Sequence, residues 1–344
     1  MKRKRLIILF ICLLVLTGTL VVLGLMFNKT ESEKINGLTN QYDVSASGQI
    51  AFVNYENGKP QLFLYNEKRS TRELVAEFDE NTYIFDPTFS PDDSMLAYVT
   101  SNKDKETKLK STVHLFDTEQ KESKDLFTDT ATITELEFLP NQSALLYLRS
   151  GTFENYSPIA GKRPHGFDVY AYQFSDKAQR QLTHFDQYSM MSLRVDTDGK
   201  RIFIQKDDDA NVTNADESFE VKQRIFEIPL EQPDKIKIAS DSARDVDIYS
   251  FILLPSGKEM IFQSVSNPDS SGTFEYELYR YNMETKEEKQ LTHFGKHASD
   301  PIVSMDGEII YFMLDTNFGK GNAEYHLYKM NSDGSGAEEI TFSK

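Results

Sequence analysis

The chain has 344 residues, of which 39% are hydrophobic, 27% charged and 12% aromatic, a balance that argues against a disordered chain. Residues 1–29 hold five of the 38 Lys and Arg residues and none of the 54 Asp and Glu residues, so residues 30–344 carry a formal charge of −21. Such an acidic body is repelled by polyphosphate, which argues against nucleic acid as a partner. The single cysteine, Cys12, excludes an intramolecular disulfide.

The N-terminal segment predicts a membrane anchor. Residues 1–5 form a basic tail, and residues 6–27 are 22 residues without a charge, enough for a transmembrane helix across a hydrocarbon core of about 30 Å. The run exceeds the apolar core of a signal peptide and lacks a small-x-small cleavage site, which favours an uncleaved signal-anchor. The positive-inside tendency then places the N-terminus in the cytoplasm and the later residues outside the cell membrane. Residues 28–37 form a polar linker, and we expect the folded domain over residues 38–344.

An eight-residue pattern recurs six times in the folded domain. Each copy has a polar first residue, an apolar fourth residue and turn-forming residues at its end, as in DPTFSPDD at residues 86–93 and DPIVSMDG at residues 300–307. The copies begin at Gln41, Asp86, Glu135, Ser192, Ser250 and Asp300. The spacings of 45 to 58 residues between copies suit one supersecondary unit per copy.

The segments that follow each copy also recur. A second strand comes at once, as in SMLAYVT from residue 94, and a polar loop leads to a third strand, as in VHLFD from residue 113. A short fourth strand closes the unit, as in KDLFT from residue 124. One such unit cannot bury both faces of its sheet, whereas a closed ring of units can. The sequence therefore predicts an all-β fold, a six-bladed β-propeller of four-stranded antiparallel blades.

Closure of the ring has two alternatives at this stage. Every blade consists of four contiguous strands, or the segment before Gln41 completes the last blade.

The repeat resembles that of TolB-type six-bladed propellers, which also occurs in the propellers of dipeptidyl-peptidase-type enzymes. DPTFSPDD carries the resemblance best, since the family repeat has an aromatic residue followed by Ser-Pro-Asp-Gly, and the resemblance covers about residues 38–344. In the peptidase-type relatives, the chemistry resides in a separate α/β-hydrolase domain after the propeller, which we do not expect here. Because the sequence also contains no catalytic motif such as G-x-S-x-G or H-E-x-x-H, we expect a non-catalytic protein- or ligand-binding scaffold of the cell envelope. Its partner is an envelope protein, a peptide or a wall polymer.

We expect the first residue of each copy near the mouth of the central channel, on the face that also carries the long second-to-third loops. Its acidic members are Asp86, Glu135 and Asp300, and they have two interpretations. They hold a divalent cation or a small polar ligand on the axis, or they cap backbone groups between blades. Two copies of QLTHF place His184 and His293 in blade-to-blade connections near the same face.

Other candidates lie in the long loops. Arg163 belongs to GKRPHG, the one basic stretch of an acidic body, and it is either an anion ligand or part of an ordinary loop tip. Four aromatic residues of these loops favour a scaffold, because exposed aromatics anchor interfaces: Phe153, Tyr156, Phe219 and Phe274. The alternative function is a metal-dependent lyase or hydrolase, which requires several of the carboxylates and histidines within metal-bonding reach of one point.

Overall fold

The computed structural model describes the chain except for residues 1, 28–34, 104–108, 156–161, 211, 213–220 and 343–344. The described part contains one α-helix, α1 (Lys2–Phe27), and one 3-10 turn, η1 (Glu67–Arg69). Within it, no helix is both long and apolar enough to cross a membrane. The predicted span and linker lie partly outside the described residues, since the side chains described in α1 are those of Arg3 and residues 10–23.

After α1 the chain forms successive groups of four antiparallel strands, each group in chain order. The first three groups are β1 (Gly37–Val44), β2 (Gln49–Glu56), β3 (Lys59–Asn66) and β4 (Thr71–Glu77); β5 (Thr82–Phe89), β6 (Met95–Asn102), β7 (Ser111–Asp117) and β8 (Glu122–Asp129); and β9 (Thr132–Phe138), β10 (Ala144–Asn155), β11 (Lys162–Gln173) and β12 (Gln179–Gln181). The next three are β13 (Met190–Val195), β14 (Arg201–Asp207), β15 (Gln223–Pro229) and β16 (Lys237–Ile238); β17 (Ile248–Leu253), β18 (Glu259–Val265), β19 (Tyr276–Asn282) and β20 (Glu288–Gln290); and β21 (His297–Val303), β22 (Ile309–Asp315), β23 (Tyr325–Asn331) and β24 (Glu338–Glu339). A single parallel pair, Tyr276 with His297, joins the last two groups into one sheet.

The all-β fold with four-stranded antiparallel sheets is confirmed. The segment before Gln41 belongs to β1, which pairs with β2, and the last group is built from C-terminal strands alone. Of the two alternatives for closing the ring, the one in which every blade consists of four contiguous strands is therefore correct. The fourth strands of the later groups are shorter than predicted, because the chain makes one more backbone bond, such as that from Leu182 N to Val169 O at 2.8 Å, and then leaves the sheet.

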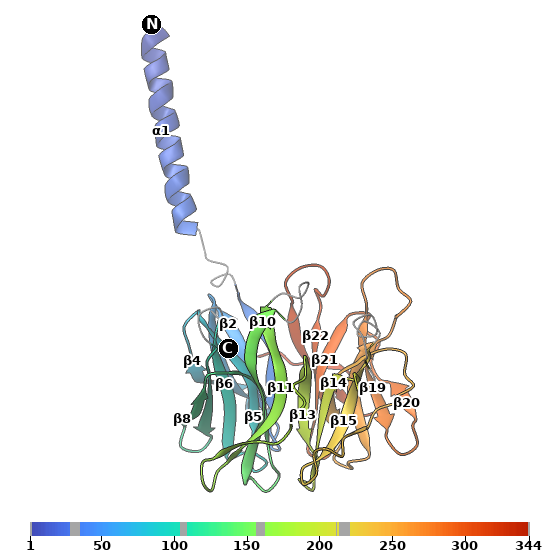
Figure 1. Cartoon of the computed structure of the whole chain (residues 1–344). Coiled ribbons are helices and arrows are strands. Elements are labelled where there is room, and N and C mark those ends of the chain that lie inside the picture. Colours follow the sequence, from blue (N-terminus) through green and yellow to red (C-terminus); the bar gives the residue numbers. More distant parts are fainter. Residues whose placement is uncertain are drawn as a thin grey trace.

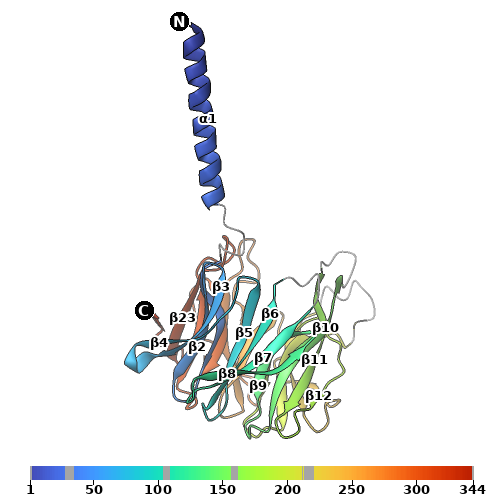
Figure 2. The same cartoon turned by 90° about the vertical axis from the view of Figure 1, so that its left-hand side faces the viewer.

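Apolar side chains pack between neighbouring sheets. One cluster joins Val53 of the first sheet to Leu96 of the second, and similar clusters follow at each later boundary in the described chain. A further cluster joins Phe52 of the first sheet to Met313 of the last group, so the arrangement closes on itself. Figure 1 shows the sheets standing side by side, and Figure 2 shows the long strands β10 and β11 at one side. Burial between sheets is what a propeller uses in place of a single central core.

The turns at the ends of the inner strands interlock neighbouring sheets. Gly199 and Gly307, at the eighth position of their copies, have φ of 67° and 76°, a region that glycine occupies without steric cost. A Cβ atom at either glycine would lie 3.3 Å from a proline Cδ of the preceding sheet, that of Pro140 or Pro255. The recurring Pro and Gly of the sequence pattern are therefore partners across a sheet boundary.

We predict that Gly307→Ala destabilises the protein more than Gly257→Ala does. Gly257 has a similar φ of 65°, but a Cβ atom at this position would have no other atom within 4 Å. Its substitution should cost about 1 kcal/mol from the left-handed backbone alone, and Gly307→Ala adds the contact with Pro255. Urea unfolding of the full chain measures both, and equal losses would show that the turns do not touch.

Candidate functional site

The inner strands of the ring carry the candidate residues on local bulges. The pairing register shifts where each candidate lies, between Phe85 and Thr88 for Asp86 and between Ser299 and Ile302 for Asp300. Asp86 and Asp300 have φ of 46° and 51°, which is unusual for residues with a side chain. A bulge re-aims a side chain, and here the side chains reach the next sheet.

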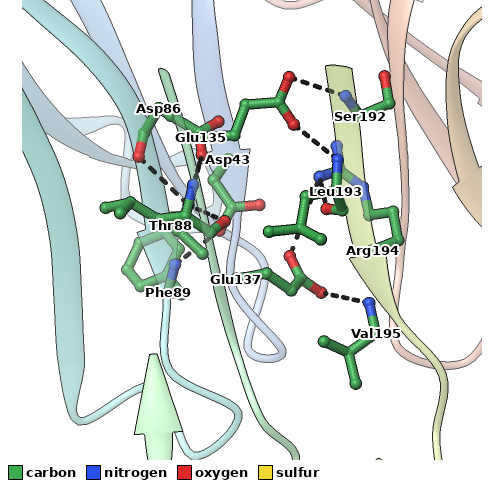
Figure 3. A network of polar contacts seen from close by, with 11 residues as sticks. Asp43, Asp86, Thr88, Phe89, Glu135, Glu137, Ser192, Leu193, Arg194 and Val195 are labelled. Carbon is green, nitrogen blue, oxygen red and sulfur yellow. Dashed lines mark hydrogen bonds and ion pairs between the residues drawn. The ribbon is translucent and has the colours of Figure 1, made fainter. Parts of the chain in front are cut away.

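The first residue of several copies accepts a backbone N–H of the next sheet. Gln41 Oε1 accepts from Asp86 N at 2.8 Å, and Asp86 Oδ2 accepts from Leu136 N at 2.5 Å. The Glu135 carboxylate accepts from Ser192 N at 2.7 Å and from the following amide at 2.6 Å (Figure 3). These are the contacts that the capping interpretation requires.

The same kind of contact continues around the ring to the first sheet. Ser250 Oγ accepts from Asp300 N at 3.0 Å. Asn40 Nδ2 donates to Asp300 Oδ2 at 3.2 Å, and the Tyr42 hydroxyl donates to the Asp300 carbonyl at 2.6 Å. Asp300 thus connects the last group of strands to the first.

A second set of axial residues occupies the third position of the copies, which the sequence analysis missed. Asp43 Oδ2 accepts from Phe89 N at 2.7 Å, and Glu137 Oε1 accepts from Val195 N at 3.4 Å. Arg194 lies beside Glu137 with an Nη1 to Oε2 distance of 3.9 Å (Figure 3). The available signal was a charged residue at this position of otherwise apolar strands in three copies.

Arg194 is the cation among these axial carboxylates. Its Nη1 donates to the Leu193 carbonyl at 2.7 Å, and its Nε is buried without a hydrogen-bond partner in the described structure. The side chains of Arg194 and Glu137 remain 21% and 23% exposed, so water in the channel reaches them although they lie inside the ring. The Arg194 guanidinium thus acts on several carboxylates and does not form one close ion pair.

Five axial carboxylates surround this one cation, and the pKa of each of them is raised. Burial raises the pKa of Glu137 to about 7 and that of Asp43 to about 6. Burial also raises the pKa of Glu135 and Asp300. It raises the pKa of Asp86 well above the ordinary range, and the negative charge of Glu135 adds to this effect. Charged carboxylates are therefore costly on this axis.

Two cavities meet at Arg194. The upper cavity, of about 470 Å³, is lined by the first halves of the inner strands, and the lower cavity, of about 330 Å³, is lined by their second halves and the turns that follow. Both share Tyr42, Asp86, Arg194 and Ile302 as walls. The upper cavity opens among the long loops, with Tyr188, Met191, Tyr249, Tyr325, His297 and Arg163 in its walls.

The structure brings four of the six candidates to the upper cavity. Asp86, Glu135 and Asp300 line it together with Arg163, whose guanidinium carbon lies 4.7 Å from the centre of the Tyr188 ring. Among the described residues, Arg163 forms no ion pair through its guanidinium. Arg163 is thus a cation at the cavity mouth in an acidic molecule.

The histidines of the two QLTHF copies do not line either cavity. His184 is exposed, and so is His293, whose Nδ1 lies 3.0 Å from Gln290 Nε2. The threonine before each histidine explains the repetition, because Thr183 Oγ1 accepts from Val169 N at 2.9 Å and Thr292 Oγ1 accepts from a third-strand amide at 2.8 Å. In these two sheets the threonine of the motif therefore holds the chain at the end of the fourth strand against the third strand.

The structure also bears on the predicted metal site and on the four aromatic residues of the long loops. In the described part of the chain, no group of three or more His, Cys, Asp or Glu side chains is arranged to hold a metal ion. Phe274 is 43% exposed and Phe153 is half-buried, while Tyr156 and Phe219 lie outside the described residues.

Solved structures share this fold at low sequence identity. TolB from Acinetobacter baumannii matches with a TM-score of 0.57 and 17% identity over 80% of this chain and 58% of that chain. A TolB described as putative, from Agrobacterium tumefaciens, matches with a TM-score of 0.58 and 12% identity over 81% of this chain and 87% of its own. An oligogalacturonate lyase from Vibrio parahaemolyticus matches with a TM-score of 0.55 and 13% identity over 90% and 79%. The fold is therefore that of a TolB-like propeller.

No protein-family model and no curated protein matches the sequence. The chain spans 58% of the length of the Acinetobacter TolB that it resembles.

We predict that Thr183→Val destabilises the protein by about 1–3 kcal/mol, because it removes a buried hydroxyl that serves Val169 N and the Asp168 carboxylate. The neighbouring His184→Ala is the matched control and should change stability by less than about 0.5 kcal/mol, since His184 is exposed. Thermal unfolding of both variants decides whether threonine or histidine gives the motif its role. A larger loss for the histidine variant would contradict this assignment.

We predict that Glu137→Gln stabilises the protein at alkaline pH. The folded-state pKa of about 7 lies above the ordinary 4.5, so the folded state holds the proton more tightly and stability falls as pH rises from about 4.5 through about 7. The glutamine variant lacks this loss and should be more stable by on the order of 2 kcal/mol at pH 8 and nearly unchanged near pH 4.5. Unfolding free energies across this range measure the effect.

Glu154→Gln, at an exposed position of β10, is the control for a general loss of negative charge. The same pH dependence in the Glu137→Gln variant and the unsubstituted protein would contradict the assignment to Glu137.

Proposed function

We propose that this chain is an extracytoplasmic six-bladed propeller, tethered to the cell membrane by α1, that binds a protein or peptide of the cell envelope without catalysing a reaction. The upper cavity carries this proposal. It combines a volume of about 470 Å³ with walls that include Tyr188, Tyr249, Tyr325 and Met191, on the face of the long loops. Aromatic side chains around a concave site are the usual anchors of a binding surface.

The state of the polar groups favours binding over catalysis. Glu135 gives both carboxylate oxygens to backbone amides of the next sheet, and Asp86 gives one of its own. Groups used in this way are held by the fold, whereas a general acid or base must face a substrate. His184 and His293 lie exposed outside the cavity, and among the described residues no three His, Cys, Asp or Glu side chains are arranged to hold a metal ion, which favours binding over the lyase alternative.

The likenesses to the TolB structures and to the lyase, at 12–17% identity, extend to the fold alone, so the preference for binding over catalysis rests on the site. The basic tail and the 22 uncharged residues at 6–27 support the tether and the location outside the membrane.

We predict that a photo-reactive benzoylphenylalanine in place of Met191 cross-links the full chain to a specific envelope protein in its native cells. Met191 is 41% exposed at the upper cavity, and Leu74, 51% exposed on β4, is the matched control outside it. Adding Tyr249→Ala should lower the Met191 yield roughly thirtyfold, because truncating an aromatic anchor costs about 2 kcal/mol. Thermal unfolding checks that this variant is folded.

Equal cross-linking from both positions would contradict the proposed site. Stoichiometric binding of Mn²⁺, Ca²⁺ or Zn²⁺ in calorimetry, abolished by Asp86→Asn, would favour the metal-dependent lyase or hydrolase instead.

A further inference from the structure

The chain joins the propeller at the face where the upper cavity opens. The Ile35 carbonyl accepts from Gly58 N at 3.0 Å, and Asn36 Oδ1 accepts from Asn57 N at 2.7 Å. These bonds hold the residues before β1 on the turn between β2 and β3, at the second-to-third-strand end of the sheet. Both cartoon views place this end of the body toward α1 (Figures 1 and 2).

The two cavities open at opposite ends of the ring. The upper cavity is lined by Asn40 near the start of β1, by Thr134 near the start of β9 and by Arg163 of the β10 and β11 hairpin. The lower cavity is lined by Ala46 and Met305, which lie in turns after inner strands. Strand direction therefore puts the upper cavity, and not the lower one, on the side of the N-terminal junction.

The length of the connecting segment limits how the body can turn. Residues 28–34, which precede the junction at Ile35, span at most about 25 Å when fully extended, and inner strands of six to eight residues are about 20–27 Å long. Because the junction is fixed at the upper end, presenting the lower cavity to the bilayer would require nearly the whole segment to run down the side of the ring. The upper end is thus the one that faces the membrane.

The charge of the body keeps a gap open at this end. A formal charge of −21 over residues 30–344 is repelled by anionic lipid headgroups, so the propeller does not lie flat on the surface. The gap is no wider than the extended segment. An extended polypeptide fits such a space, and a folded soluble domain of ordinary diameter does not.

From this placement we propose that the upper cavity receives an extended juxtamembrane segment of a protein anchored in the same membrane. The inference rests on the proposed tether and binding function, and it adds the direction of approach and the class of partner. Aromatic walls with Met191 at the mouth suit an apolar side chain of that segment, and Arg163 adds a cation at the rim for its polar backbone or an acidic neighbour.

The test compares two methionines that line the mouths of the two cavities, Met191 (41% exposed) above and Met305 (71% exposed) below. In a Cys12→Ser background, Met191→Cys or Met305→Cys carries a donor dye on the full chain, reconstituted in phosphatidylethanolamine and phosphatidylglycerol vesicles with acceptor-labelled headgroups. Energy transfer should be at least about twofold higher from position 191, because the ends of such strands lie about 25 Å apart.

Vesicle flotation separates the possible failures. Chain that floats and shows equal transfer, or more from position 305, overturns the membrane-facing cavity and leaves the tether standing. Chain that does not float overturns the tether and this inference with it. The partner class has its own readout, since the protein cross-linked from position 191 should be membrane-anchored and modified within about seven residues of its span, which is the reach of the gap. A partner without an anchor overturns that part.

Discussion

The fold depends on one contact that recurs around the channel, in which a side chain of one inner strand accepts a backbone N–H of the next sheet. An inner strand has no strand beside it on the axial side, so its backbone groups there need other partners. Gln41, Asp86, Glu135 and Ser250 supply these acceptors directly. Because each acceptor belongs to a different group of four strands from its donor, satisfying the backbone also fixes how neighbouring groups sit against each other.

The use of carboxylates for this purpose sets the electrostatics of the channel. Acidic side chains are strong acceptors for backbone amides, but inside the ring they lose hydration, and burial raises the pKa of each. Arg194 supplies positive charge near the middle of the axis and forms the boundary between the two cavities. Holding the ring together and dividing the channel are thus carried out by one network of side chains.

The proposed binding site lies on a surface outside this network. The upper cavity is shaped by loops and by the joined ends of β10 and β11, beyond the parts of these two strands that pack against the neighbouring sheets. Tyr188, Tyr249, Tyr325 and Arg163 are among the residues that line it. The N-terminal junction shares this face, so the position of the proposed tether and the position of the proposed binding site are linked by the direction of the strands.

The sequence by itself determined the strands, the repeat and the resemblance to TolB-type propellers, because strand periodicity and turn chemistry are local properties. It also placed Asp86, Glu135 and Asp300 at the channel, since a repeated position in a ring recurs at the same radius. Only the tertiary structure decided what these residues do and that Asp43, Glu137 and Arg194 join them. All six residues make contacts across a boundary between sheets. Such a contact leaves no periodic pattern in the sequence of the strand that carries the side chain, because the partner lies in another sheet. For the same reason, QLTHF drew attention to its histidines, while the packed structure gives the role to threonine.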